Sequence, residues 1–116
     1  METVVGIRKS SKPDKKYEAV IDGRKTVSFG AKGYSDFTLH KDPDRRQRYI
    51  QRHQNNEDWS KTGINTPGFY AKHVLWNKGT IQRSIADLNE KCEDVKFRFE
   101  EMQIKTIMYN YCFNLS

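Results

Sequence analysis

The alternation of hydrophobic and polar positions predicts a β-hairpin near the start of the chain. Two runs rich in β-forming residues, 17–21 and 25–29, are joined across Asp22 and Gly23. Asp-Gly between such runs is a strong hairpin signal, because a type I′ turn needs a positive φ at both central residues. Successive strand residues alternate between the two faces of a sheet. One face is therefore expected to be buried, and it contains Tyr17, Ala19, Ile21, Val27 and Phe29.

A helix is predicted next, from about residue 43 to residue 54. Asp42 can accept hydrogen bonds from the free backbone amides at the helix start, and Pro43 at the first helical position gives up no hydrogen bond. With about 100° of rotation per residue, the segment has two distinct faces. One face holds Arg45, Arg48 and Arg52, and the other holds Arg46, Tyr49, Ile50 and His53.

Two more helices are predicted after a polar, turn-rich loop. Thr66 and Pro67 repeat the start signal ahead of a helix over residues 67–77, whose apolar side chains lie almost all the way round, so we expect it to be buried. Thr80 caps the next helix, over residues 81–92, in which apolar residues recur with helical spacing. Those apolar residues are Ile81, Ile85, Leu88 and Cys92.

The two ends of the chain carry less distinct signals. Residues 3–7 can form a short strand, but residues 8–16 are polar, basic and interrupted by Pro13, which is typical of an exposed arm. In the tail, residues 95–99 alternate as in a strand, and so do Ile107, Tyr109, Tyr111 and Phe113, whereas later apolar residues also fit one helix face. The later residues are Ile104, Ile107, Met108 and Tyr111. We favour a helix that continues into an extended end.

Together these elements predict one α+β domain, with an N-terminal β-hairpin packed against about three short α-helices, an N-terminal arm and a C-terminal extension. A chain of 116 residues has the usual size of one domain, and an aromatic content of 12% is more than disordered chains contain. We place the basic arm at residues 1–16, the domain at 17–92 and the extension at 93–116. The expected core residues are Tyr34, Phe37, Tyr49, Ile50, Trp59, Phe69 and Trp76.

The formal net charge is +6, and the basic excess lies in residues 1–83. Such a balance favours acidic partners, namely nucleic acid, an anionic membrane surface or an acidic protein face. The candidate contact residues are Arg8, Lys9, Lys12, Lys15, Lys16, Arg45, Arg48 and Arg52. These residues could track a phosphate backbone, with neighbouring aromatic rings stacked on bases. Alternatively, the helix arginines form an ordinary solvated face and pair with nearby carboxylates, which are Asp42, Asp44, Glu57 and Asp58.

No sequence motif indicates catalysis. Each histidine has a structural interpretation, His40 as a residue that contacts the cap at Asp42, and His53 and His73 as partly buried imidazoles on helix faces. A zinc site of the three histidines and Cys92 stays open by spacing, although no CxxC or HxxxH pair supports it. We predict that the protein is not an enzyme and has no catalytic residue, metal, cofactor or small-molecule substrate.

The sequence also bears on compartment and membrane insertion. Cys92 and Cys112 are the only cysteines, too few for a disulfide framework, so free thiols in a reducing compartment are expected. The first residues, METVVGIRKS, have neither a long apolar stretch nor a small-residue cleavage site. No window approaches the roughly 18 apolar residues of a membrane span. We therefore expect neither a signal peptide nor a transmembrane segment.

Much of the chain resembles a family of small proteins of the nucleocytoplasmic large DNA viruses. The shared motifs, in order, are FG (29–30), GYSDFT (33–38), HKD (40–42), the arginine-rich helix (45–53), NEDW (56–59), TPGF (66–69) and LWNK (75–78). The resemblance covers about residues 15–91, and the chain is similar to the longer version found in iridoviruses. It departs from the family at residues 70–73, YAKH, where relatives tend to carry Trp or Ser-Arg combinations, so no role of that helix surface is carried over.

The resemblance implies a context and no chemistry, because the family brings no enzymatic activity. Small basic virion proteins of such viruses commonly cement the capsid from inside or contact the packaged genome. We therefore expect a non-enzymatic structural protein of the virion, a minor capsid or cement-type component that contacts other capsid or virion proteins. Its expected location is the virion, and the host cytoplasm or nucleus during assembly. The alternative is a sequence-nonspecific DNA-binding protein of the packaged viral genome that uses the same arginines.

Overall fold

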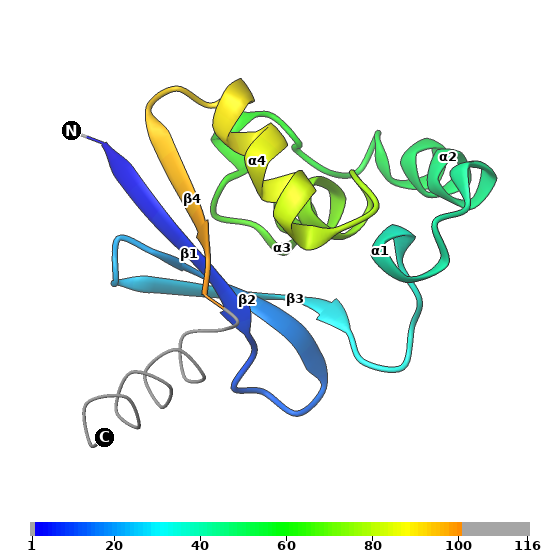
Figure 1. Ribbon diagram of the computed structural model, residues 1–116, viewed down its shortest axis with the longest axis horizontal. Helices are drawn as coiled ribbons and strands as arrows, with labels where there is room; N and C mark the ends of the chain where they lie inside the picture. Colours follow the sequence, from blue (N-terminus) through cyan, green and yellow to red (C-terminus); the bar gives the residue numbers. More distant parts are fainter. Residues whose placement is uncertain (1, 101–116) are drawn as a thin grey trace, which may run out of the picture.

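The computed structural model describes residues 2–100 of the chain. Their elements are β1 (Thr3–Lys9), β2 (Lys15–Ile21), β3 (Lys25–Ala31), α1 (Phe37–His40), α2 (Pro43–His53), η1 (Lys61–Gly63), α3 (Pro67–Tyr70), η2 (Ala71–Leu75), α4 (Ile81–Lys91) and β4 (Val95–Phe99). Within this range four strands form one mixed sheet in the order β3-β2-β1-β4. Figure 1 shows α3 and α4 over one face of the sheet, with α1 and α2 beyond the end of β3. The predicted α+β fold with N-terminal strands is confirmed.

The hairpin of β2 and β3 forms as the sequence predicts. Asp22 and Gly23 have φ angles of 52° and 68°, the positive values that the expected turn requires. Tyr17 lies opposite Phe29 in the strand pairing, and the inner face of the hairpin is turned toward the helices. The predicted inner face is confirmed, because all of its members are buried except Tyr17, which is partly buried against the core.

β1 is an inner strand of the sheet. It pairs antiparallel with β2 and parallel with β4, so that Val5 lies between Ile21 and Phe97. The side chains of Val5 and Ile7 are fully buried. Parallel strands cannot be joined by a tight turn. The long segment from β2 to β4, which carries all the helices found within residues 2–100, supplies the connection that brings β4 beside β1.

A helical layer of α3, η2 and α4 covers the sheet. α3 continues into the π-helical turn η2, and Phe69, Tyr70 and Val74 on this segment are at most 1% exposed. The Thr80 hydroxyl accepts a hydrogen bond from the backbone N–H of Arg83 at 3.1 Å, which caps α4 as predicted. The expected buried helix over residues 67–77 is confirmed for residues 67–75, although residues 71–75 are π-helical and residues 76 and 77 lie beyond its end. Across residues 2–100, no helix combines the length and the apolar content that crossing a bilayer demands.

The expected division into arm, domain and extension is wrong, because strands at both ends belong to the sheet. The polar stretch after β1 is no arm; residues 10–14 form the loop between β1 and β2. Residues 95–99 form β4 and do not form the helix we favoured, since Val95 and Phe97 alternate with exposed residues and pair along β1. The predictions for residues 101–116 lie outside the described part of the chain.

The main core lies between the sheet and the helical layer. Its most buried members are Val5, Ile7, Ala19, Phe29, Phe69, Tyr70, Val74, Leu75, Leu88 and Phe97. Phe69 was expected there, and Tyr49 is also buried, with 8% of its surface exposed. The partly buried members of the expected core are Phe37, Ile50, Trp59 and Trp76. Tyr34 is a wrong prediction: it is 73% exposed, because it follows Gly33 in the loop after β3.

Candidate functional site

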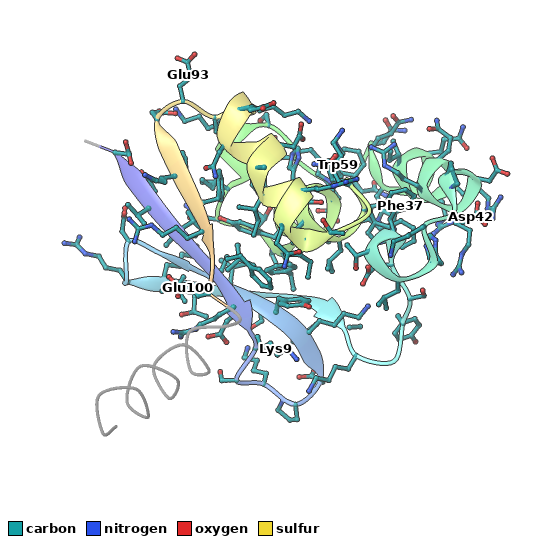
Figure 2. All side chains as sticks on the ribbon, viewed as in Figure 1. Lys9, Phe37, Asp42, Trp59, Glu93 and Glu100 are labelled. Atoms are coloured by element: carbon teal, nitrogen blue, oxygen red, sulfur yellow. The ribbon has the colours of Figure 1, made fainter. Side chains whose placement is uncertain are left out.

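An aromatic cluster fixes α2 against the end of η2. The Tyr49 ring stacks on the Trp76 ring with centroids 4.4 Å apart and planes 1° from parallel, and the His53 ring lies 4.4 Å from Tyr49 on the same helix. Arg46 adds a polar tie, since its Nε donates to the carbonyl of Trp76 at 3.0 Å. In Figure 2, Phe37 and Trp59 lie between α2 and the helices that cover the sheet. Side chains that stack and bond in this way give α2 a defined position.

The start of α2 is fixed by its cap. The Asp42 carboxylate accepts from the backbone N–H groups of Asp44 at 2.9 Å and Arg45 at 3.5 Å. His40 Nδ1 accepts from the backbone N–H of Asp42 at 2.9 Å, which confirms its predicted role beside the cap. Burial is the main cause that lowers the pKa of His40, which favours its neutral form. His40 is therefore explained as a structural residue.

The three arginines on the outer face of α2 have no carboxylate partner among residues 2–100. Arg45, Arg48 and Arg52 are exposed, and none of them forms an ion pair with a described residue. Two of the carboxylates that we considered as partners have other contacts. Asp42 caps the helix, and Asp58 accepts hydrogen bonds from Ser60 and Thr62. The result is a stripe of exposed arginines without an ion-pair partner among the described residues, which we call the arginine stripe.

A groove runs beside this stripe, between α2, the end of β3, the loop that follows it and η2. Its volume is about 510 Å³. Two of the stripe's arginines, Arg45 and Arg52, line it, whereas Arg48 does not. The aromatic side chains that line it are Tyr34, Tyr49, His53 and Trp76. We call this site the α2 groove, and it combines positive charge with aromatic surface.

Lys16 and Asp36 form an ion pair at the edge of the α2 groove. Lys16 Nζ lies 2.6 Å from Asp36 Oδ2, and Asp36 is 2% exposed. The same carboxylate accepts from the backbone N–H of Thr38 at 2.9 Å and so caps α1. Lys16 was predicted to contact an acidic partner, but its charge is balanced within the protein. The pair ties β2 to the loop that carries Tyr34.

The other predicted contact residues lie along β1 and β2, away from α2 in sequence and in secondary structure. Arg8 Nε donates to Glu18 at 2.8 Å, and the buried Glu18 carboxylate also accepts from the backbone N–H of Ser11 at 2.9 Å. The hydrogen bond from Ser11 is the main cause that lowers the pKa of Glu18. Lys9 and Lys12 are exposed, and Lys15 is partly buried. Of the eight predicted residues, the three α2 arginines lie on one helix face, whereas Lys9 and Lys16 line a separate pocket beside the β1–β2 hairpin.

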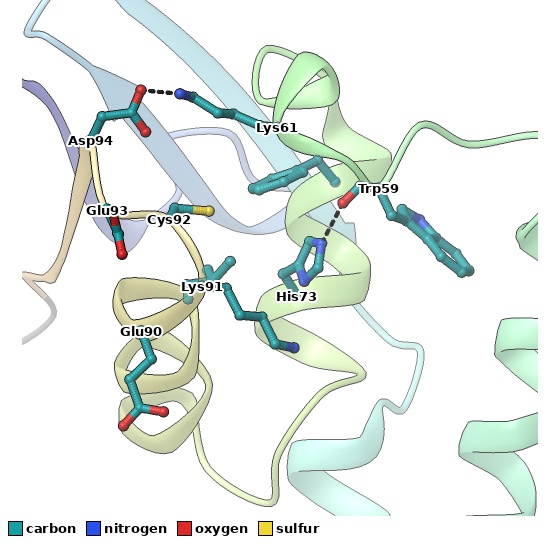
Figure 3. Close-up of a pocket in the computed structure, with 10 residues that line it drawn as sticks. Trp59, Lys61, His73, Glu90, Lys91, Cys92, Glu93 and Asp94 are labelled. Atoms are coloured by element: carbon teal, nitrogen blue, oxygen red, sulfur yellow. Dashed lines mark hydrogen bonds and ion pairs between the residues drawn. The ribbon is translucent and has the colours of Figure 1, made fainter.

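A second cavity, of about 440 Å³, opens between η2 and the end of α4 (Figure 3). His73 lies in it, with Nε2 2.8 Å from the carbonyl oxygen of Trp59, while the buried Nδ1 has no hydrogen-bond partner among the described residues. Burial lowers the pKa of His73 to about 4, so its imidazole is neutral at pH 7. The ring packs on Phe69 with centroids 4.5 Å apart, and at 8% exposed it is more buried than the partly buried setting that the sequence predicted. Cys92 lines the same cavity from the end of α4.

The structure does not assemble the zinc set that spacing left open. His40 and His53 lie near the two ends of the α1–α2 segment, whereas His73 and Cys92 line the second cavity. In the part of the chain from residue 2 to residue 100, no three His, Cys, Asp or Glu side chains come together as a metal site. The absence of a metal, a cofactor and catalysis stays a prediction.

Sequence reasoning missed two residues of this region. Arg46 was placed on the packing face of the helix, but its bonds to the carbonyls of Trp76 and Asn77 were not foreseen. Tyr34 was assigned to the core, although Gly33 before it, with φ 90°, marks a loop. A helix-face pattern can place an arginine beside aromatic residues, but the two carbonyls it reaches are 30 and 31 residues further along the chain.

Comparison with known proteins gives one partial match. Residues 5–53 match a family of unknown function (DUF5754), which is less than half of the 116 residues. The matched segment runs from within β1 to the last residue of α2, so it contains the strands of the hairpin and the arginine stripe. No curated protein and no solved structure matches the chain. This chain is thus similar to that family over its first half, and the similarity brings no activity with it.

Proposed function

We propose that the protein is a non-enzymatic structural component of a virion, of the minor capsid or cement type, that docks through α2 on acidic faces of other virion proteins. The observation that carries the docking surface is the arginine stripe, because Arg45, Arg48 and Arg52 are exposed and have no carboxylate partner among the described residues. The virion context comes from the resemblance to proteins of large DNA viruses. The proposed location follows from it, namely the virion, and the host cytoplasm or nucleus during assembly.

The surroundings of the stripe suit a protein interface. Tyr34 and Leu39, which are 73% and 65% exposed, precede α2 in the loop after β3 and in α1. Interface cores are enriched in aromatic residues and arginine, and a few such anchors supply most of the binding energy. Guanidinium groups bind carboxylates in a bidentate geometry that lysine cannot reproduce. An acidic protein face that binds here would thus contact the exposed apolar side chains of Tyr34 and Leu39 and the positive charge of the arginine stripe together.

A second candidate partner is the DNA of the packaged genome. The stripe rises along one helix, and its first and last arginines are about 10 Å apart along the helix axis. Phosphates recur at short intervals along a nucleic acid, and lysines and arginines that neutralise them give sequence-independent binding. The aromatic lining of the α2 groove is the observation that favours this candidate, because bases can stack on such rings.

The two partners are separated by one pair of matched variants. The first replaces Arg45, Arg48 and Arg52 with alanine. The control replaces three other exposed residues, Arg24, Lys25 and Lys96, with alanine, and so removes the same amount of charge elsewhere. For the virion proposal, the wild-type chain binds purified capsid shells stripped of DNA at fixed stoichiometry, the first variant loses this binding and the control keeps it. For the DNA candidate, duplex affinity falls steeply with salt, and the first variant lowers the slope of log K against log salt by up to about 3.

Two results would count against docking through α2. One is equal loss of binding in the stripe variant and in the charge-matched control, which would indicate a general effect of net charge. The other is shell binding that the stripe variant retains in full. Thermal unfolding of both variants verifies that the exposed substitutions leave the fold intact.

A further inference from the structure

We propose that the α2 groove holds one nucleotide unit of a single-stranded nucleic acid, with the base against the groove's aromatic rings and the phosphates at Arg45 and Arg52. The inference rests on the second candidate partner proposed above, nucleic acid bound at α2, and names a chemistry for the groove beside the arginine stripe. The groove's volume of about 510 Å³ falls within the range of roughly 300–1,000 Å³ that is typical of small-ligand sites.

The aromatic side of the groove is built before any ligand arrives. Tyr49 is 8% exposed and packs between two rings, with the Trp76 centroid at 4.4 Å and the His53 centroid at 4.4 Å. Burial raises the pKa of Tyr49 to about 12, so its hydroxyl stays neutral. Tyr49 is thus a buried support that holds His53 and Trp76 in place, and these two partly buried rings line the groove. Fixed rings lose little conformational freedom when a flat ligand packs against them.

Tyr34 supplies an exposed ring at the same groove. It is 73% exposed and lines the groove from the loop after β3, which Lys16 and Asp36 anchor. An aromatic ring that is open to water and joined to an anchored loop is available for stacking on an unpaired base. The groove thus offers aromatic surface from two segments, the loop and α2.

The charges that line the groove select an anion. Arg45 and Arg52 are exposed and have no carboxylate partner among residues 2–100, whereas the one lining carboxylate, Asp36, is already paired with Lys16. The two arginines are seven residues apart, about 10 Å along the helix axis. They can therefore contact phosphates on both sides of a base that lies between them. A nucleotide, which carries both an aromatic base and a phosphate, matches this combination of rings and positive charges. A neutral aromatic ligand does not.

The ligand must be single-stranded because the groove recognises the face of a base. In a duplex both faces of each base are covered by neighbouring bases, so an aromatic ring cannot stack there without breaking the stack. Unpaired strands leave these faces accessible, and binding proteins use aromatic side chains on them with little sequence preference. The groove would bind duplex only through phosphates.

Tryptophan fluorescence can report on the groove directly. The chain has two tryptophans, so a Trp59→Phe background leaves Trp76 at the groove as the single reporter. In this background, oligothymidylate is expected to quench Trp76 saturably, more tightly than a duplex of equal length. Arg45→Ala, Arg52→Ala and Tyr34→Ala should each weaken oligothymidylate binding about tenfold. Arg48→Ala removes the same charge from the same helix outside the groove and should weaken binding less than about threefold.

Several results would overturn the groove assignment. The first is a duplex that binds as tightly as the single strand. The second is an Arg48→Ala variant that weakens oligothymidylate binding as much as Arg45→Ala does. The third is equal quenching of Trp76 by inorganic phosphate or thymidine monophosphate at the same concentrations. In these cases the proposed function would still hold if binding of the protein to capsid shells requires the arginine stripe. The converse result is that the protein binds the single strand through the groove and shows no binding to capsid shells. That result would support the nucleotide site and reject docking on virion proteins. Unfolding curves for the three groove variants verify that each remains folded.

Discussion

At the scale of single residues, burial decides the chemistry of His73. Its Nε2 contacts the carbonyl oxygen of Trp59, an interaction that raises its pKa, but desolvation is the larger effect and lowers the pKa to about 4. An unfolded chain restores the ordinary value near 6.5. The unfolded state therefore binds more protons than the folded state between about pH 4 and pH 6.5, and the fold loses stability as the pH falls through this window.

This shift predicts a measurable pH dependence. Between pH 7 and pH 5 the free energy of unfolding should fall by about 2 kcal/mol on account of His73 alone. His73→Gln keeps an amide donor for the Trp59 carbonyl and removes the titration, so its stability should depend less on pH over the same interval. Urea unfolding at both pH values measures the difference. Equal pH dependence in the wild type and in His73→Gln would show that His73 is not the cause.

At the scale of elements, the hairpin contains two glycines with positive φ but different surroundings. Gly23, with φ 68°, lies in the turn, and a Cβ there would meet no atom within 4 Å. Gly30, with φ 77°, lies near the end of β3, and a Cβ there would lie 2.8 Å from Leu75 Cδ1. Leu75 is 2% exposed and packs in the core, so it has little room to move. Gly30 thus allows η2 to approach β3 closely.

The two glycines give a matched pair of substitutions. Gly23→Ala should cost only backbone strain, about 1 kcal/mol, because the new methyl group points into open space. Gly30→Ala should cost about 1–3 kcal/mol more, since it adds overpacking against Leu75. Denaturant unfolding of the two variants compares these losses. Equal losses would contradict a close contact between β3 and η2.

At the scale of the whole molecule, β1 holds the sheet together. It is the only described strand that pairs with both the hairpin and β4, so strands from the two ends of the described chain lie side by side, with β4 at one edge of the sheet. Ile7 on β1 is fully buried in the main core. The helical layer packs on this sheet, and the aromatic cluster attaches α2 at one end. The position of the α2 groove therefore depends on residues from most of the chain.

An inner β1 predicts how the chain responds to substitutions near its start. Ile7→Ala should lower the free energy of unfolding by about 2–5 kcal/mol, because it leaves a cavity in a packed core. Lys12→Ala, in the exposed loop after β1, should change it by less than about 0.5 kcal/mol. Chemical denaturation of both variants is the measurement. A negligible effect of Ile7→Ala would mean that β1 is a detachable arm after all.

The sequence by itself determined the elements whose signals are local. The turn at Asp22 and Gly23, the cap at Asp42 and the cap at Thr80 each depend on backbone angles or hydrogen bonds within a few residues, so they could be predicted and were confirmed. The arginine stripe could also be predicted, because residues with helical spacing share one face. Its exposure is compatible with the neighbouring side of the helix, where Tyr49 packs inward.

Only the tertiary structure decided how distant segments meet. The strand character of residues 95–99 depends on hydrogen bonds to β1, about 90 positions earlier, and a helix and a strand remain alternatives until that edge is present. In the same way Lys16 is neutralised by Asp36, 20 residues away, while Arg45 has no ion-pair partner among residues 2–100 although Asp42 and Asp44 are close to it in sequence. Ion pairing and burial depend on which residues are close in space. For segments far apart in the chain, the local sequence does not determine which residues those are.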